Sequence, residues 1–136
     1  MITFNYETEF ILQDEDKLSI WILSVIKSEG FKEGEINYIF CDDDYLLKLN
    51  KEFLKHNTLT DIISFDYSIG KQIHGDIYIS IDRVLENSTK FKVKFMDELK
   101  RVMIHGILHY CGYTDKKEAD KSIMRSKENH YLKQID

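Results

Sequence analysis

The stretch from residue 94 to 112, KFMDELKRVMIHGILHYCG, limits the fold more than any other part of the chain. At about 100° per residue, it predicts a helix with one apolar side and an opposite polar stripe. The polar stripe consists of Lys94, Glu98, Arg101, His105 and His109, and the apolar side of Phe95, Leu99, Val102, Met103, Gly106 and Tyr110. A helix of this kind packs its apolar side against a core. We therefore expect the two histidines at the edge of the core, facing a cleft or solvent.

The other segments predict a single domain over residues 1–136, of α+β or α/β class, with a small mixed sheet of about four strands against several helices. Alternating apolar residues indicate strands, and helical spacing with capping residues indicates helices. The expected strands cover 2–7, 36–42, 60–67 and 75–81, and the expected helices cover 14–30, 42–55, 82–91, 94–112 and 117–134. A short segment joins the last two strands, which predicts a hairpin. We expect the two histidines of the late helix, with the turn after it, to form a metal site.

Composition argues against a disordered, a membrane-spanning or a secreted protein. Hydrophobic residues make up 43% and charged residues 32%, so the chain is expected to fold. It contains no apolar run of about 20 residues and no signal peptide at its start, which predicts a soluble cytoplasmic protein. The net charge of −5 argues against a general nucleic-acid binder. However, residues 69–136 carry a net +3, from either a local basic surface or a solvated helix face.

The two histidines of the helix form a candidate metal site. His105 and His109 are four residues apart, so both imidazoles can reach one ion. Gly112 is a suitable helix C-cap, after which the chain can turn back and bring Asp115 near the pair. The alternative is a pair of boundary histidines with no metal. Cys111 is a competing ligand, but it points away from the histidine stripe and is expected to be a small core residue.

The residue after the first histidine argues against one class of metalloenzyme. Zinc proteases place a glutamate there as general base, and this chain has Gly106. A protease of that kind is therefore disfavoured. Glycine inside a helix costs about 1 kcal/mol relative to alanine, so its presence predicts that another backbone or a ligand approaches closely.

Three ordered motifs resemble a known family. ELKRVMIHGILHYCGYTD (98–115) resembles the signature of the bacterial YbeY family of metal-dependent endoribonucleases, in which His-Gly-x-Leu-His precedes Gly-Tyr and a third histidine. LNKEFLKHNTLTDIISF (49–65) is similar to the second motif of the family, and GDIYIS (75–80) to its Gly-Asp-Ile strand. Met124 falls where the family carries a methionine in its last helix. The resemblance extends over most of the chain.

The resemblance implies a single-strand endoribonuclease of ribosomal RNA maturation and ribosome quality control. Its partners would be ribosomal RNA and the ribosome, and a water activated by a metal would hydrolyse the phosphodiester. His105, His109 and Asp115 would hold one Zn²⁺ ion. Asp115 stands where the family has its third histidine, and an oxygen ligand there should also admit Mn²⁺ or another divalent ion.

The chain also departs from the family pattern at a residue that would contact the substrate. Leu54 stands where the family carries an arginine thought to serve catalysis. Lys55 or Lys51 would replace its charge but not its bidentate contact with phosphate. Thr60 and Asp61 either orient groups at the cleft, with Asp61 as a partner of a metal-bound histidine, or simply pin the start of a strand.

Two rival functions remain open from the sequence. One is a non-catalytic ribosome-assembly factor whose metal is structural, an interpretation favoured by Leu54 and by the acidic first half of the chain. The other is a metallohydrolase for a small substrate. A metal site that opens onto a cleft would favour catalysis. The other clusters are given structural roles: Asp42, Asp43 and Asp44 are expected to cap a helix, and His56, His74 and His130 to be surface residues.

Overall fold

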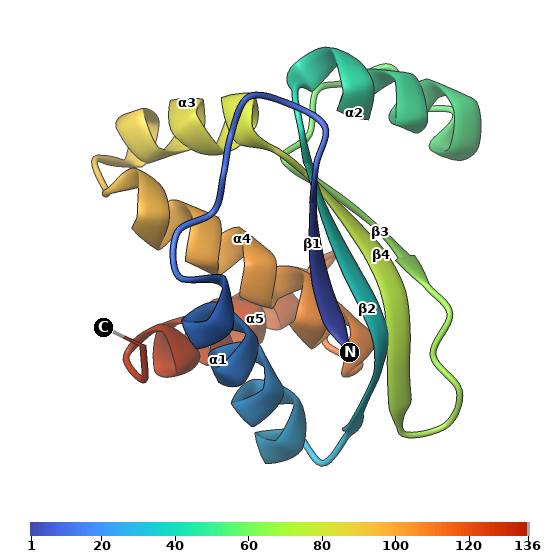
Figure 1. The fold of residues 1–136 in the computed structure, drawn as a ribbon, viewed down its shortest axis with the longest axis vertical. Helices are drawn as coiled ribbons and strands as arrows, with labels where there is room; N and C mark the ends of the chain where they lie inside the picture. Colours follow the sequence, from blue (N-terminus) through green and yellow to red (C-terminus); the bar gives the residue numbers. More distant parts are fainter. Residues whose placement is uncertain (136) are drawn as a thin grey trace.

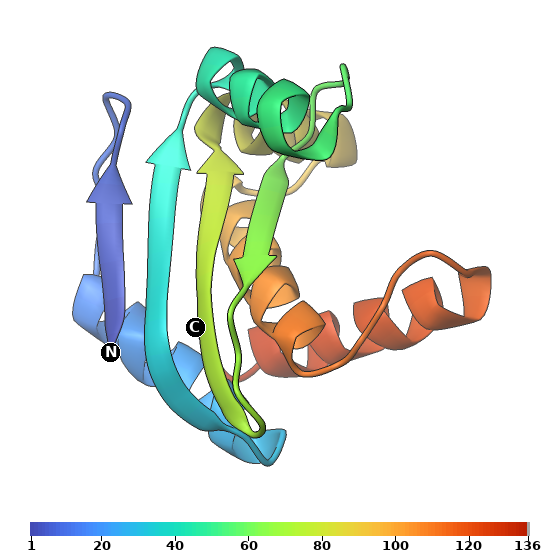
Figure 2. The same ribbon diagram turned by 90° about the vertical axis from the view of Figure 1, so that its right-hand side faces the viewer.

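A mixed sheet of four strands forms the frame of the computed structural model, which describes residues 1–135. The strand order is β1-β2-β4-β3, with β1, β2 and β4 parallel and β3 antiparallel to β4 (Figure 2). In chain order the elements are β1 (Ile2–Tyr6), α1 (Glu15–Ser28), β2 (Lys32–Cys41), α2 (Asp43–Leu49), the π-helical turn η1 (Asn50–Leu54), β3 (Ile62–Asp66), β4 (Gln72–Ser80), α3 (Ile81–Phe91), α4 (Phe95–Tyr110) and α5 (Glu118–Leu132). The predicted small mixed sheet and the predicted hairpin are confirmed.

The main core lies on one face of the sheet, and a smaller buried cluster of Cys41, Leu46 and Ile63 is separate from it. Successive strand residues point to opposite faces, and on β2 and β4 the alternate residues Ile36, Tyr38, Phe40, Ile77 and Ile79 are fully buried. Helices α1 and α4 cover this face, and α5 packs against α4 (Figure 1). Within residues 1–135, no helix is long and apolar enough to cross a membrane.

Two elements differ from the sequence expectation. Strand β2 begins at Lys32 rather than at residue 36, because its first residues pair with β4 although they lack apolar alternation. The helix expected over 42–55 ends as an α-helix at Leu49 and widens into η1. There the side chain of Asn50 is buried and donates to the carbonyl of Thr58, 2.8 Å away, which ties the following loop to the helix. The expected cap is confirmed, since the Asp42 carboxylate accepts from the backbone N–H of Tyr45 at 2.9 Å.

Helix α4 lies unusually close to the sheet, and this sets the position of its histidines. A β-carbon added at Gly106 would stand 3.1 Å from Cδ1 of Ile77 and 3.2 Å from Cδ1 of Ile62. A close approach is therefore found at this glycine, but the neighbours are isoleucine side chains of the sheet rather than the backbone or ligand that was predicted. Tyr38 donates to the Met103 carbonyl at 2.9 Å, which fixes the middle of the helix to β2. With its apolar side held down in this way, the helix presents its polar stripe along the rim of the core.

The end of α4 is fixed by Tyr110, which lies over Gly75 of β4. The Tyr110 hydroxyl donates to the Phe65 carbonyl at 2.9 Å. A β-carbon at Gly75 would overlap the Tyr110 ring and stand 2.7 Å from the Phe65 oxygen. We expect Gly75→Ala to lower the free energy of unfolding by about 1–3 kcal/mol, because the overlap with backbone cannot be relieved by a side-chain rotation.

Urea unfolding would measure this loss. Gln72→Ala, at an exposed position of the same strand, is the matched control and should change stability by less than about 0.5 kcal/mol. An unchanged unfolding midpoint for Gly75→Ala would show that β4 and α4 are not packed as tightly as described.

Candidate metal centre and its cleft

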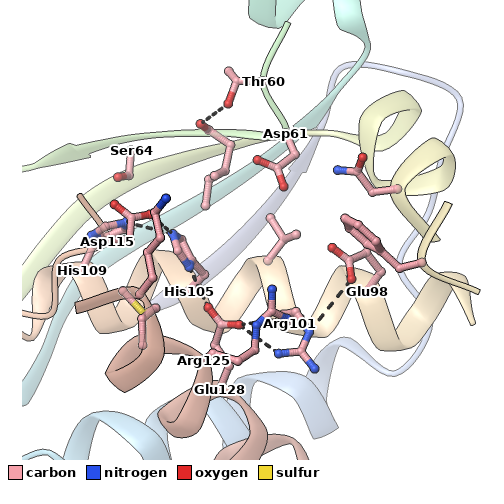
Figure 3. Close-up of a pocket in the computed structure, with 16 residues that line it drawn as sticks. Thr60, Asp61, Ser64, Glu98, Arg101, His105, His109, Asp115, Arg125 and Glu128 are labelled. Atoms are coloured by element: carbon pink, nitrogen blue, oxygen red, sulfur yellow. Dashed lines mark hydrogen bonds and ion pairs between the residues drawn. The ribbon is translucent and has the colours of Figure 1, made fainter. Parts of the chain in front are cut away.

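Three donor atoms converge at the end of α4. Nε2 of His105 lies 2.9 Å from Nε2 of His109 and 3.2 Å from Oδ2 of Asp115, and His109 Nε2 lies 3.6 Å from the same oxygen (Figure 3). Two ligands about 2.0–2.1 Å from one tetrahedral zinc ion lie about 3.4 Å apart. The three separations bracket this value. The residues therefore fit one small divalent ion, and the structure brings together the three predicted metal ligands.

The opposite nitrogens of both imidazoles are occupied by hydrogen bonds. His105 Nδ1 lies 2.7 Å from Oε2 of Glu128, and His109 Nδ1 lies 3.0 Å from the carbonyl oxygen of Tyr113. A carbonyl can only accept, so His109 carries its proton on Nδ1 and directs an Nε2 lone pair at His105. Two nitrogen lone pairs 2.9 Å apart repel each other unless a proton or a cation lies between them. The pair is thus arranged to share a positive charge.

The electrostatics separate the two histidines. Burial alone would lower the pKa of His105, but its hydrogen bond to Glu128 and the charges of Glu128 and Asp115 outweigh this and raise it. Burial and the positive charge of His105 lower the pKa of His109 below its ordinary value. For Glu128, burial is outweighed by hydrogen bonds from His105 and Arg101, which lower its pKa and keep it ionised. A buried negative charge therefore stands directly behind the histidine pair.

The turn that delivers Asp115 follows from the sequence. Gly112 has φ +100°, a left-handed conformation that suits glycine. Its N–H donates to the His109 carbonyl at 3.0 Å, and the N–H of Tyr113 donates to the Leu108 carbonyl at 3.1 Å. This is the Schellman pattern of helix termination. It reverses the chain, so that Asp115 returns to the histidine pair as the sequence predicted.

Glu29, at the end of α1, fixes this turn from behind, and sequence reasoning did not find it. Its buried carboxylate accepts from the hydroxyl of Tyr113 at 2.7 Å, from Lys127 at 3.1 Å and from the hydroxyl of Tyr131. Burial would raise the pKa of Glu29, but these three donors lower it. Because the carbonyl of Tyr113 also holds His109, the network extends from α1 and α5 to a metal-site histidine.

Glu128 was missed as well, although the sequence carried a signal for it. On α5 the residues Met124, Glu128 and Tyr131 are buried at helical spacing. An acidic residue within an apolar stripe needs a buried partner. Here the partners are Arg101, 2.9 Å away, and His105.

The donor group lines an open cavity of about 550 Å³ between α4, α5, the end of α3 and the start of β3. Thr60 and Asp61 line this cleft, so both sequence candidates lie at the site. Lys55 does not line it and is exposed just after η1. Leu54 is 45% exposed and also lies outside the cleft lining.

Two further carboxyl groups line the cleft. Burial raises the pKa of Asp61 despite the positive charge of His105, and burial raises the pKa of Glu98 despite that of Arg101. Figure 3 shows both carboxyls on the side of the cavity away from His109 and Asp115.

The cations of the cleft differ in how strongly they are held. Arg101 donates to Glu128 and to the side chain of Asn129, both at 2.9 Å, and its Nε lies 4.0 Å from Glu98. Arg125 is 59% exposed and approaches Glu128 only to 3.6 Å. Its guanidinium is therefore freer than that of Arg101 to bind a ligand in the cleft.

The remaining histidines lie away from the donor group. His56 and His130 are exposed, and the half-buried His74 accepts from the backbone N–H of Glu35 at 3.0 Å. Cys111 packs against the core and Cys41 is buried, and both are free thiols.

The fold and the site define an α+β domain whose open polar cleft carries three side chains arranged to hold a metal ion. A family model described as Endoribonuclease YbeY matches residues 2–136. The Endoribonuclease YbeY of Flavobacterium psychrophilum is 64% identical over 98% of this chain and 95% of that protein. The chain belongs to the YbeY endoribonuclease family, which confirms the resemblance of the three motifs.

Two more distant relatives match over most of their length. The Endoribonuclease YbeY of Cytophaga hutchinsonii is 45% identical over 95% of this chain and 91% of that protein. A protein of Thermotoga maritima, solved in solution, superimposes with a TM-score of 0.71 at 27% identity, covering 99% of this chain and 89% of that one.

Proposed function

We propose that this protein is a metal-dependent endoribonuclease that cleaves single-stranded RNA in ribosomal RNA maturation and ribosome quality control in the cytoplasm. One observation carries the catalytic part of the proposal. The Nε2 atoms of His105 and His109 and a carboxylate oxygen of Asp115 converge at an open cleft, while an oxygen atom lies behind each Nδ1, at 2.7 Å and 3.0 Å. The family name supports RNA as the substrate. The ribosomal role rests on the resemblance of the motifs.

The ligand set supports zinc and does not require it. Two imidazoles and one carboxylate make a common catalytic zinc set, and the carboxylate also suits Mn²⁺. When bound, such an ion polarises a phosphate oxygen and lowers the pKa of water toward about 7. The protein supplies the rest: Glu128 and the Tyr113 carbonyl fix the tautomer and direction of each imidazole.

The cleft favours a single strand over a duplex. Its volume of about 550 Å³ is in the range of small-ligand sites, and a double helix is too wide to enter it. Arg125 and Lys121 are exposed cations that line the cleft and would offset phosphate charge. Neither stands where the family has its arginine, so here α5 would supply the charge that Leu54 cannot.

The open position of the donor group weighs against a purely structural metal. A structural ion is normally enclosed by protein ligands, whereas His109 is 30% and Asp115 42% exposed and both line the cleft. We therefore prefer the nuclease to the non-catalytic assembly factor.

A cleavage assay with matched substrates tests this function. We expect the purified protein to cut a single-stranded RNA oligonucleotide at least tenfold faster than the same sequence in a duplex. A chelator should abolish cleavage, and added Zn²⁺ or Mn²⁺ should restore it. Cleavage that survives complete removal of metal would contradict the metal mechanism. A protein that holds one equivalent of metal but cuts no RNA would support the assembly factor.

A further inference from the structure

Phe91 is an exposed aromatic residue inside the cleft. It is the last residue of α3, its exposed fraction is 54%, and it lines the same cavity as the donor group. Asn87 lies one helical turn earlier, on the same side of α3, and also lines the cavity. A single exposed phenylalanine is common on protein surfaces. A phenylalanine paired with an amide inside a substrate cleft calls for a ligand with both an aromatic face and hydrogen-bonding edges.

Charge is distributed unevenly along the cleft. Arg125 is 59% exposed and pairs with Glu128, the carboxylate that holds His105, only at 3.6 Å, so an accessible guanidinium lies near the donor group. Glu98 lies seven residues before His105 on α4, which corresponds to about 10 Å of helix rise. In Figure 3 Asp61 and Glu98 occupy this farther part of the cavity. The end near the metal ligands suits a phosphate once a bound cation offsets Asp115 and Glu128. The part beside Asp61 and Glu98 disfavours a second phosphate, because Arg101, 4.0 Å from Glu98, is already bonded to Glu128 and Asn129.

A nucleobase matches these features better than a phosphate does. It is uncharged, its face stacks on an aromatic ring, and its edge can exchange hydrogen bonds with an amide such as Asn87. The ammonium of Lys90 lies over the Phe91 ring, 5.8 Å from its centroid, so a base would stack on the opposite ring face, and the ammonium could attract the adjoining sugar–phosphate backbone.

We propose that Phe91, with Asn87, forms a nucleobase subsite in which a base neighbouring the cleaved phosphodiester stacks on the phenyl ring. Phe91 ends α3 four residues before α4 begins at Phe95, so it belongs to the end of the cleft where Glu98 lies in the first turn of α4. This inference rests on the proposed function, because it assigns another part of the same cleft. It explains how a cleft with only a few free cations can hold a single strand: stacking supplies affinity that does not depend on net charge.

Phe91→Ala tests the subsite through the separation of KM from kcat. We expect the substitution to raise KM for a single-stranded oligonucleotide about tenfold, the scale of one lost base–aromatic stack, and to change kcat less than twofold. Phe91→Trp should keep the wild-type KM. Leu85→Ala is the matched control, because Leu85 lies on the same helix with the same 54% exposure but does not line the cleft.

Abasic substrates distinguish stacking from a structural effect. If Phe91 stacks on one base, removing that base should raise the KM of the wild type as much as Phe91→Ala does. The same abasic substrate should then cause no further loss in the variant. Losses that multiply at every abasic position, or an unchanged KM in Phe91→Ala, would overturn the subsite.

Fluorescence anisotropy with the wild type and with Phe91→Ala reports RNA binding without cleavage. A wild type that binds RNA without cutting it would refute the nuclease function and still test the subsite through Phe91→Ala. A wild type that cuts RNA, with Phe91→Ala binding equally well, would refute the subsite alone.

Discussion

His109→Ala is expected to leave the protein folded and without stoichiometric metal. Removing one of three ligands should weaken metal binding by more than the 10–100-fold typical of residues behind the ligands. RNA cleavage should fall to background. The fold should survive, because His109 lies at the rim of the core and its Nδ1 bonds only the Tyr113 carbonyl. We expect the free energy of unfolding of the metal-free variant to lie within about 1 kcal/mol of the metal-free wild type.

Elemental analysis and urea unfolding on the same preparations would measure both effects. His130→Ala is the control, since His130 is exposed on α5, lies 3.3 Å from the Gln134 amide and touches the Tyr131 ring edge to face, away from the metal ligands. Asp115→Ala should also lose the metal. One equivalent of metal retained in His109→Ala would refute the site. Metal lost in His109→Ala but kept in Asp115→Ala would keep the histidine pair and require a different third ligand.

The sequence predicted those parts of the site that depend on neighbouring residues. The spacing of His105 and His109, the left-handed turn at Gly112 and the return of Asp115 all arise within eleven consecutive residues. Helical periodicity and capping rules act over this range. Gly106 also carried its own signal, since a glycine inside a helix needs a reason. The hairpin of β3 and β4 was predictable for the same cause.

Contacts between residues far apart in the sequence were not predictable in this way. Glu128 is 23 positions from His105, and Glu29 is 84 positions from Tyr113. Their roles depend on where α5 and α1 pack against α4, which no local pattern specifies. The strand order β1-β2-β4-β3 depends on crossovers of the same range. The widening of α2 into η1 follows from the buried Asn50 and its bond to Thr58, a contact that periodicity alone does not reveal.

Glu128→Ala is expected to cost both stability and metal affinity. The Glu128 side chain is 4% exposed and is shared by His105 and Arg101. Its removal leaves a largely buried guanidinium without its closest carboxylate, and breaking such a pair typically costs about 3–5 kcal/mol when both charges are fully buried. Arg101 keeps 21% exposure and its bond to Asn129, so we expect a smaller loss of about 2–3 kcal/mol. Metal affinity should fall about 10–100-fold, because His105 loses the acceptor that orients it.

Glu128→Gln separates the two effects. The amide keeps the shape and one acceptor oxygen, so Arg101 can remain bonded and most of the stability should return. Its NH₂ group would then face the Nδ1 proton of His105, and two donors repel each other. We therefore expect Glu128→Gln to regain stability but not metal affinity, measured by urea unfolding and by competition with a metal-binding dye. Glu118→Gln, at a 92% exposed position of the same helix, should change neither. If Glu128→Gln bound metal as tightly as the wild type, an ionised acceptor behind His105 would be unnecessary, and the role of Glu128 would be to neutralise Arg101.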